Sequence, residues 1–262
     1  LPNFITICNI ESKDPVQVIA GNERVIRPRL ADAAFFFETD KKTPLVDRLE
    51  KLESVVFQQK LGTVADKSRR VQQLAGALAG KIGAPVELAE RAALLSKADL
   101  VSDMVYEFPE VQGVIGGYLA RAEGLGDDVA NAIASHYQPA GPDDDCPTDG
   151  VAVAVAMADK LDTLAGFFGM GELPTGSKDP FALRRAALGV IRMVLENGLR
   201  VRLSDLFRVA GANDETAEAL LGFFADRLKV HLREQGVRHD LIAAVFALGG
   251  QDDLVQLLAR VN

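Results

Sequence analysis

Apolar residues recur at helical spacing through most of the chain that follows Asp66, and this periodicity constrains the fold more than any other feature. A first row within residues 66–79 consists of Val71, Leu74, Ala75 and Leu78. After a break at 83–85, a second row consists of Leu88, Ala92 and Leu95. Such rows leave water by packing against other helices, so the spacing predicts a mainly α fold.

Two charged residues continue these apolar rows. Lys67 precedes Val71 by one helical turn, and Asp99 extends the row that ends at Leu95. Both side chains should therefore face the interior, where a charge is unfavourable unless an opposite charge compensates it. The sequence thus predicts buried ionic groups inside the helical region.

The start of the chain differs in character from the middle. Residues 4–29 are rich in Ile and Val, and Gly and Asn at 21–22 separate the runs. This composition is typical of strands joined by a hairpin turn. Helical spacing begins after Asp32 and returns in the row Leu45, Leu49 and Leu52.

Further helices are expected beyond Leu203, with breaks at 211–214, near Gly236 and at 249–250. These changes divide the chain into three parts. Residues 1–58 are interpreted as the end of a preceding α/β domain with a connecting helix. Residues 59–200 form a helical domain, and 201–262 form a helical linker region. We therefore expect a short β-containing segment only at the N-terminal end.

Composition narrows the class of protein. With 262 residues, 48% hydrophobic and 25% charged, the chain can bury a core and is not disordered. Its longest apolar run, Val151–Ala158, is far shorter than the roughly 20 residues that span a bilayer, so no membrane contact is expected. The net charge of −8 opposes non-specific binding to DNA or RNA, so any nucleic-acid contact must be local.

Three further features bear on the cellular location and on the extent of the polypeptide. No signal peptide is visible at the start of the chain. Cys8 and Cys146 are far apart and are interpreted as free thiols, which favours a reducing, cytoplasmic location. The chain begins without Met and ends inside a periodic run, so we expect it to be a piece of a longer polypeptide.

The segment 157–190 contains the most informative polar residues. Asp159 and Asp162 lie on one helical face, and a loop with glycines separates this helix from a second one. Asp179 and Pro180 are typical of a helix start. Paired carboxylates can hold a metal ion or transfer protons, although on a helix they are usually solvated. The Gly-Ser-Lys of the loop does not match the spacing of a phosphate-binding loop.

Basic residues of this second helix fall on two faces. Arg184 continues a row with Phe181 and Leu188, which predicts that it faces inward and pairs with Asp159 or Asp162. Arg185 and Arg192 lie on a more polar face and are expected to point outward, where they could meet phosphate. Further candidates for an RNA contact are Lys178, Arg69 and Arg70. Basic clusters are more often simply solvated.

Three runs, DKSRRVQQLAGALA, AALLSKADL and MADKLDTL, resemble the ligand helices of the HD superfamily of metal-dependent phosphohydrolases. The resemblance implies an HD-like helical domain over 59–200. However, Lys67 stands where the first His ligand is expected, and Ser96 and Lys97 replace the His-Asp pair. Of the usual ligands Asp159 remains, with His136 as a possible auxiliary.

A lysine inside a ligand ring repels a cation, so we expect no metal and no catalytic residue here. Instead, Lys67 is predicted to pair with Asp99 or Asp159 in place of the metal. Residues at the degenerate site are thus assigned structural roles: Lys67, Ser96, Lys97, Asp99, His136, Asp159, Asp162 and Arg184.

A closer resemblance covers nearly the whole chain. Long runs such as GNERVIRPRLADAAFFFETD, EFPEVQGVIGGYLA and GSKDPFALRRAALG are similar to the β subunit of bacterial tetrameric (α2β2) glycyl-tRNA synthetase. The resemblance implies that the parent protein attaches glycine to tRNA(Gly) with ATP and Mg²⁺, at an adenylate site on the separate α subunit. It implies partners, the α subunit and tRNA, and no cofactor bound by this chain.

The same resemblance implies that 201–262 leads toward an anticodon-binding domain not included here, and that the chain alone is inactive. Two alternatives stay open. One is an active HD phosphohydrolase, against which the replaced His-Asp pair argues. The other is a purely structural interaction module.

Overall fold

The structure, a computed structural model, describes residues 3–234, 236–238, 240 and 252–261. Helices make up most of these residues. The strands among them form one two-stranded antiparallel sheet, β1 (Val56–Gln58) and β2 (Gly62–Thr63). The predicted mainly α fold is therefore confirmed. No helix within these ranges has the length and apolar character needed to cross a membrane.

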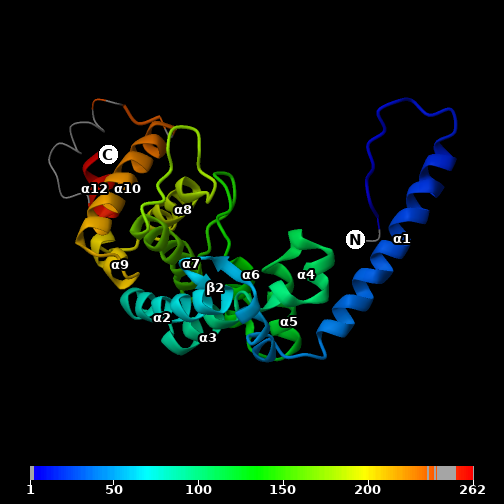
Figure 1. Cartoon of the computed structure of the whole chain (residues 1–262). Helices are drawn as coiled ribbons and strands as arrows, with labels where there is room; N and C mark the ends of the chain where they lie inside the picture. Colours follow the sequence, from blue (N-terminus) through cyan, green and yellow to red (C-terminus); the bar gives the residue numbers. More distant parts are fainter. Residues whose placement is uncertain (1–2, 235, 239, 241–251, 262) are drawn as a thin grey trace.

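The strands predicted near the N-terminus are wrong. Residues 15–40 form α1 (Pro15–Asp40), a long helix that projects from the body, and the expected turn at 21–22 lies inside it (Figure 1). Pro15 occupies the first turn, and the Asp14 side chain accepts a hydrogen bond from the backbone N–H of Gln17. Val and Ile cost a helix only roughly half a kcal/mol each, so these start signals prevail over composition.

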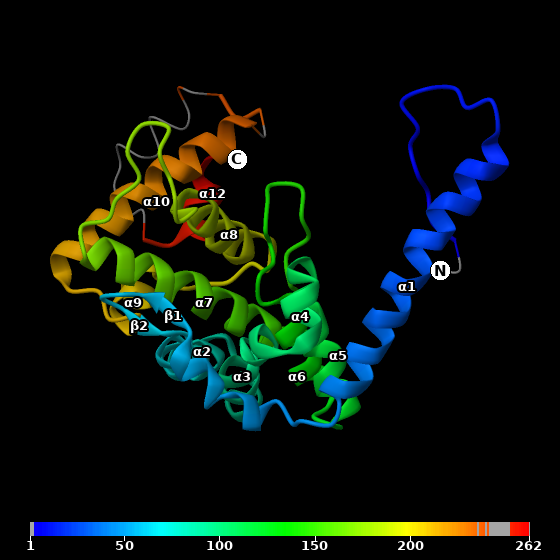
Figure 2. The same ribbon diagram turned by 45° about the vertical axis from the view of Figure 1, so that its right-hand side comes forward.

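The end of α1 is fixed by a buried carboxylate. Asp40 accepts hydrogen bonds from the backbone N–H groups of Asp103 (3.0 Å) and Met104 (2.9 Å), at the start of α4 (Asp103–Glu107). The same carboxylate pairs with the buried Arg48 at 3.1 Å. These contacts attach the projecting helix to the body, as two views of the chain show (Figures 1 and 2).

The row of leucines that follows α1 does not form an α-helix. It folds into two short 3₁₀ helices, η1 (Val46–Arg48) and η2 (Lys51–Ser54), although Leu45 and Leu52 are fully buried as the pattern predicts. The small sheet then leads directly into the first long helix of the body.

The body is organised around α7 (Gly150–Gly169), whose residues are almost all buried. It packs against α2 (Val64–Ile82), α3 (Val86–Leu95) and α6 (Asp127–Ser135). Against its other side pack α8 (Leu183–Glu196) and α10 (Asp214–Glu234) (Figure 2). Contact on all sides explains why the run Val151–Ala158 carries no polar residue.

The predicted rows on α2 and α3 face this central helix. The α2 row is buried, and the helix begins with a capping box formed by Thr63 and Asp66. It ends at Gly83, which adopts a left-handed conformation with φ of 77°, at the predicted break. Ala92 and Leu95 of the α3 row are buried, whereas Leu88 is only partly buried.

Short helices connect α3 to α6: η3 (Ala98–Val101), α4, η4 (Pro109–Val111) and α5 (Val114–Ala122). On α5, Gly116 and Gly117 allow the close approach of α6. A Cβ added to Gly117 would lie 2.7 Å from the Ala134 Cβ and 2.8 Å from the Ala130 carbonyl oxygen. The two glycines therefore permit close packing of α5 against α6.

The C-terminal part is helical as predicted, with α9 (Leu203–Val209), α10 and α12 (Leu254–Val261). Breaks occur at 211–213 and at Gly236, and the expected break at 249–250 lies outside the described residues. One buried core runs from Leu45 to Leu257. The boundaries proposed at 58 and 200 stay predictions.

Candidate functional site

A cluster of buried ionic groups lies between α2, α7 and the end of α3. Lys67 on α2 places its Nζ 3.2 Å from Asp159 Oδ1 and 3.2 Å from Asp162 Oδ2, both on α7. The Nζ of Lys97 lies 3.2 Å from the same Oδ1 of Asp159. Of the two partners predicted for Lys67, Asp99 and Asp159, the structure pairs it with Asp159. Two cations therefore flank the one carboxylate that resembles a metal ligand.

Lys67 makes three further contacts inside the protein. Its ammonium group donates to the Thr163 hydroxyl at 2.8 Å and to the Asp159 carbonyl oxygen at 3.2 Å. It also lies 4.7 Å from the centre of the Phe57 ring. The surrounding positive charges hold the pKa of the Asp159 carboxyl well below its usual range, against the effect of burial. Asp159 is thus ionised and compensated.

Asp162 has a second partner, Arg70, which was predicted to contact RNA. Arg70 on α2 binds its carboxylate through two nitrogens, at 2.6 and 3.2 Å, and donates to the Leu61 carbonyl oxygen at 2.9 Å. Such a two-pronged contact is the strong form of an arginine–carboxylate pair. Arg70 is therefore engaged inside the protein, and its side chain is only 39% exposed.

His136 is fully buried at the end of α6 and contacts Lys97. Its Nδ1 lies 2.6 Å from the Ile133 carbonyl oxygen, which can only accept, so Nδ1 carries the proton. Its Nε2 then accepts from Lys97 Nζ at 2.9 Å. Burial and the Lys97 charge lower the pKa of His136 to about 3. The imidazole is neutral and occupied on both nitrogens.

Asp99 is buried as predicted but does not pair with Lys67. Its Oδ2 accepts from the backbone N–H groups of Gly113 (2.6 Å) and Gly116 (3.0 Å). Burial raises the pKa of this carboxyl. Ser96 is also buried, and its hydroxyl donates to the Ala93 carbonyl oxygen at 2.8 Å. Both side chains therefore form hydrogen bonds with nearby backbone groups.

Arg184 is not the internal partner of Asp159 or Asp162, so that expectation is wrong. It is half-buried and donates to the Gly176 carbonyl oxygen at 2.7 Å. The reason is the start of α8, which begins at Leu183 although the Asp179 carboxylate caps it. Phe181 precedes the helix and is not part of the row; Arg184 and Leu188 remain one turn apart on α8, but their face lines an open pocket and not the buried ion cluster.

Arg192 also departs from its predicted orientation. Its side chain is 11% exposed, pairs with Glu196 at 2.7 Å, and donates to the carbonyl oxygens of Gly141 and Pro142. Arg69 is exposed, as expected for an outward cation, but pairs with Glu53 and Asp66. Only Lys178 and Arg185 among the predicted RNA contacts are exposed without a carboxylate within ion-pair distance in the described residues.

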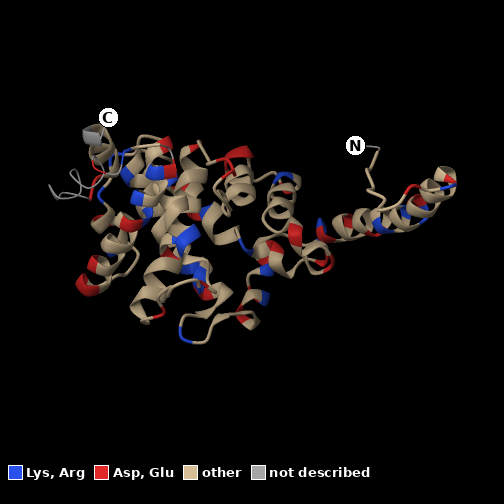
Figure 3. Ribbon diagram, turned by 90° about the horizontal axis from the view of Figure 1, so that it is seen from above, with Lys and Arg blue, Asp and Glu red and all other residues tan. Residues whose placement is uncertain are grey.

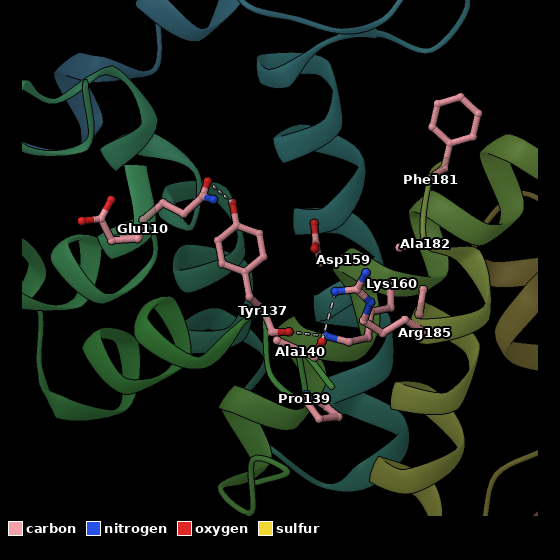
Figure 4. A pocket seen from close by; sticks show the side chains of 11 residues that line it. Glu110, Tyr137, Pro139, Ala140, Asp159, Lys160, Phe181, Ala182 and Arg185 are labelled. Atoms are coloured by element: carbon pink, nitrogen blue, oxygen red, sulfur yellow. Dashed lines mark hydrogen bonds between the residues drawn. The ribbon is translucent and has the colours of Figure 1, made fainter. Parts of the chain in front are cut away.

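An open pocket of about 480 Å³ adjoins the cluster. Asp159 and Lys160 lie between Tyr137 on one side and Phe181 and Arg185 on the other (Figure 4). We call this space the Tyr137 pocket. It joins the buried charges to the face that carries Arg185.

Lys160 and Tyr137 are parts of this site that the sequence did not reveal. Lys160 donates to the carbonyl oxygens of Tyr137 (3.1 Å) and Gln138 (2.8 Å), and the Tyr137 ring lies 3.8 Å from Lys97 Nζ. Burial lowers the pKa of Lys160 to about 8. The available signal was Lys160 itself, a second charge directly after the apolar run Val151–Ala158 and Asp159.

The residues do not fit a metal centre. Among the described residues no group of three His, Cys, Asp or Glu side chains converges on one point. A cation beside Asp159 would meet two ammonium groups 3.2 Å from that carboxylate.

Comparison with known proteins agrees with the resemblance of the sequence runs. The family model described as glycyl-tRNA synthetase beta subunit matches residues 1–247. The chain is 55% identical to the glycine–tRNA ligase beta subunits of Rhodospirillum centenum and of Phenylobacterium zucineum, and 53% identical to that of Paracoccus denitrificans.

Each of these alignments covers the whole chain but only 38 to 39% of the relative. The chain thus spans well under half the length of the relatives it matches. On the strength of the family match and of these identities, it belongs to the glycyl-tRNA synthetase beta subunit family.

Proposed function

We propose that this chain is the part of a glycine–tRNA ligase β subunit that contacts tRNA(Gly) and joins the β subunit to the rest of the assembly. The relatives carry the name of this ligase. In the proposal, the α subunit holds ATP and Mg²⁺ and forms the adenylate, and this chain supplies no catalytic residue. The cytoplasm, where tRNA is charged, is the proposed location.

One observation carries the RNA contact. Lys178 on the α7–α8 loop and Arg185 on α8 are exposed, and no carboxylate of the described chain lies within ion-pair distance of either. Most other exposed arginines are paired, for example Arg69 with Glu53. An unpaired exposed cation can meet a phosphate without first breaking an ion pair. Arg185 also lines the Tyr137 pocket, so this face is favoured over other unpaired cations.

The overall charge pattern agrees with a local contact. Basic and acidic positions both occur along α1 and are interleaved over much of the body (Figure 3). With a net charge of −8, the surface as a whole repels RNA. Binding must then depend on local groups of cations that lack acidic neighbours.

The phosphohydrolase alternative is disfavoured by the buried cluster. Metal-dependent hydrolysis needs a cation that activates water, and Lys67 and Lys97 surround the carboxylate that would hold it. A lysine that replaces a metal can preserve the packing of α2 against α7 without its chemistry. The cluster therefore supports a structural role for the HD-like helices.

A salt-titrated binding assay tests the RNA contact. We expect the double variant Lys178→Ala/Arg185→Ala to weaken binding of this chain to tRNA(Gly). It should also reduce the salt slope by roughly one unit for each phosphate that the variant no longer neutralises. Aminoacylation by the assembled ligase should then show a raised KM for tRNA with little change in kcat.

The matched control is Arg121→Ala on α5, an exposed arginine that pairs with Asp127. It should leave both the affinity and the salt slope unchanged. Equal behaviour of the double variant and the control would remove the proposed RNA face and favour the interaction-module alternative.

A further inference from the structure

A second pocket, of about 350 Å³, lies between α8, α10 and the loop 140–142. Three guanidinium groups line it, those of Arg184, Arg185 and Arg227. We call it the α8–α10 pocket. Its volume falls at the lower end of the range of small-ligand sites, roughly 300 to 1,000 Å³.

The charge of this pocket is not balanced. None of its three arginines has a carboxylate within ion-pair distance among the described residues, and Glu234 is the one acidic residue in the lining. Burial, with the Arg192 charge, lowers the pKa of the lining His231, which keeps it uncharged near neutral pH. The pocket therefore carries an excess of positive charge.

Arg227 is the least compensated of the three. It comes from α10, lies half-buried, and its Nε is buried with no hydrogen-bond partner in the described chain. Its guanidinium carbon lies 5.8 Å from the centre of the Phe223 ring, a cation–π contact. A half-buried guanidinium with an orphaned nitrogen is costly unless an anion completes it.

The walls of the pocket strengthen an electrostatic contact. Leu188 and Val230 line it together with the arginines, so an anion inside would be partly removed from water. Charged hydrogen bonds in such surroundings are stronger than on an open surface. Planar guanidinium groups match the oxygens of phosphate through paired donors.

Arg185 and Ala140 line both this pocket and the Tyr137 pocket, so the two adjoin. A phosphate held by Arg227 and Arg184 would therefore lie next to the Tyr137 pocket. The aromatic rings of Tyr137 and Phe181 in the neighbouring pocket offer surfaces on which a base can stack.

We propose that the α8–α10 pocket is a phosphate-binding site that takes a backbone phosphate of the bound RNA through Arg184, Arg185 and Arg227. This inference rests on the proposed RNA contact but names a different anchor, Arg227, which lies outside the set of residues that sequence reasoning selected. A free nucleotide carries the same chemistry and is distinguished by the test.

The test compares Arg227→Gln with Arg233→Gln. Arg233 lies on the same helix, is exposed and does not line the pocket. We expect Arg227→Gln to weaken tRNA(Gly) binding about tenfold and to reduce the salt slope by roughly one unit, whereas Arg233→Gln changes the affinity less than twofold. Arg227→Lys, which keeps the charge, should recover part of the affinity.

Inorganic phosphate serves as the second probe. At constant ionic strength, replacing chloride by phosphate should raise the unfolding temperature of the unmodified chain and of Arg233→Gln more than that of Arg227→Gln. The general stabilising effect of phosphate is common to all three proteins and cancels. Arg184→Gln repeats the comparison from the other wall, which guards against a folding defect in one variant.

The outcomes separate the two proposals. In one outcome, phosphate or AMP raises the unfolding temperature of Arg233→Gln more than that of Arg227→Gln, while the chain does not bind tRNA. The site then stands with a free nucleotide as its ligand, and the proposed RNA contact fails. In the other outcome, tRNA binding depends on Lys178 and Arg185 but not on Arg227 or Arg184, and phosphate raises the unfolding temperature of all variants equally. The proposed site is then overturned.

Discussion

The ammonium group of Lys67 on α2 lies 3.2 Å from a carboxylate oxygen of Asp159 on α7. These two helices form one of the main contacts of the body, and the ion pair lies inside it. Because Lys97 reaches the same oxygen at 3.2 Å, a single carboxylate holds cations from two separate segments. Asp159 is the carboxylate that the resemblance of three sequence runs to HD phosphohydrolases marks as a metal ligand, and here two lysines hold it.

Removing Lys67 should destabilise the fold. Lys67→Met leaves Asp159 and Asp162 with one cation fewer in a buried place, and breaking such a pair costs about 3 kcal/mol. The measurement is the free energy of unfolding in urea. Arg69→Met, an exposed arginine on the same helix, should leave the unfolding midpoint unchanged. Equal effects of the two variants would contradict a structural role for the buried pair.

Divalent metal ions should not stabilise the unmodified chain. Addition of Zn²⁺, Mn²⁺ or Mg²⁺ after chelator treatment is expected to leave the unfolding temperature unchanged, because Lys67 and Lys97 repel a cation at Asp159. The double variant Lys67→His/Lys97→Asp removes both charges and adds two metal ligands, so it should gain a metal-dependent rise. A rise of similar size in the unmodified chain would show that the site still binds metal.

The helical rows and their buried charges could be predicted because residues at helical spacing lie on one face, so a charged residue in an apolar row is buried with its neighbours. Lys67 and Asp99 were expected inside, and both are buried. The N-terminal helix could not be predicted from composition, since the start signals of Asp14 and Pro15 outweighed the preference of Val and Ile for strands.

The arginines show the limit of reading a face from spacing. The row of Arg184 included Phe181, which lies before the start of α8 at Leu183, and the face that Arg184 shares with Leu188 lines a pocket instead of the core. Arg192 was assigned to the correct helix, but the loop 140–142 folds over it and accepts its hydrogen bonds. Long-range loop contacts of this kind leave no periodic signal in a sequence.

Those loop contacts predict a difference between two arginines of α8. Arg192→Ala removes hydrogen bonds to the carbonyl oxygens of Gly141 and Pro142 and should lower the free energy of unfolding by about 1 kcal/mol. Arg185→Ala is expected to leave stability unchanged, since its contact with the Ala140 carbonyl oxygen is long, 3.4 Å. Urea unfolding of both variants measures the difference, and a reversed order would refute the assignment of Arg192 to structure.

The neutral His136 predicts a decrease in stability in mild acid. Its pKa is about 3 in the folded chain and about 6.5 when unfolded, so below pH 6.5 only the unfolded state takes up the proton. The free energy of unfolding should therefore fall by about 1 kcal/mol for each pH unit between about pH 6 and pH 4.5. In His136→Gln, whose amide oxygen can still accept from Lys97, this slope should decrease. Identical slopes would mean that another group controls the acid response.

The contact between α5 and α6 predicts opposite effects of the same substitution at two helical glycines. At Gly117 an added methyl group would meet the Ala130 carbonyl oxygen at 2.8 Å, so Gly117→Ala must push the helices apart and should destabilise the protein by about 1 to 3 kcal/mol. At Gly222, in the exposed middle of α10, nothing lies within 4 Å of such a group. There the gain in helix propensity acts alone, and Gly222→Ala should stabilise by about 0.5 to 1 kcal/mol. Urea unfolding of the two variants decides the matter, since stabilisation by both would show that α5 and α6 do not approach each other so closely.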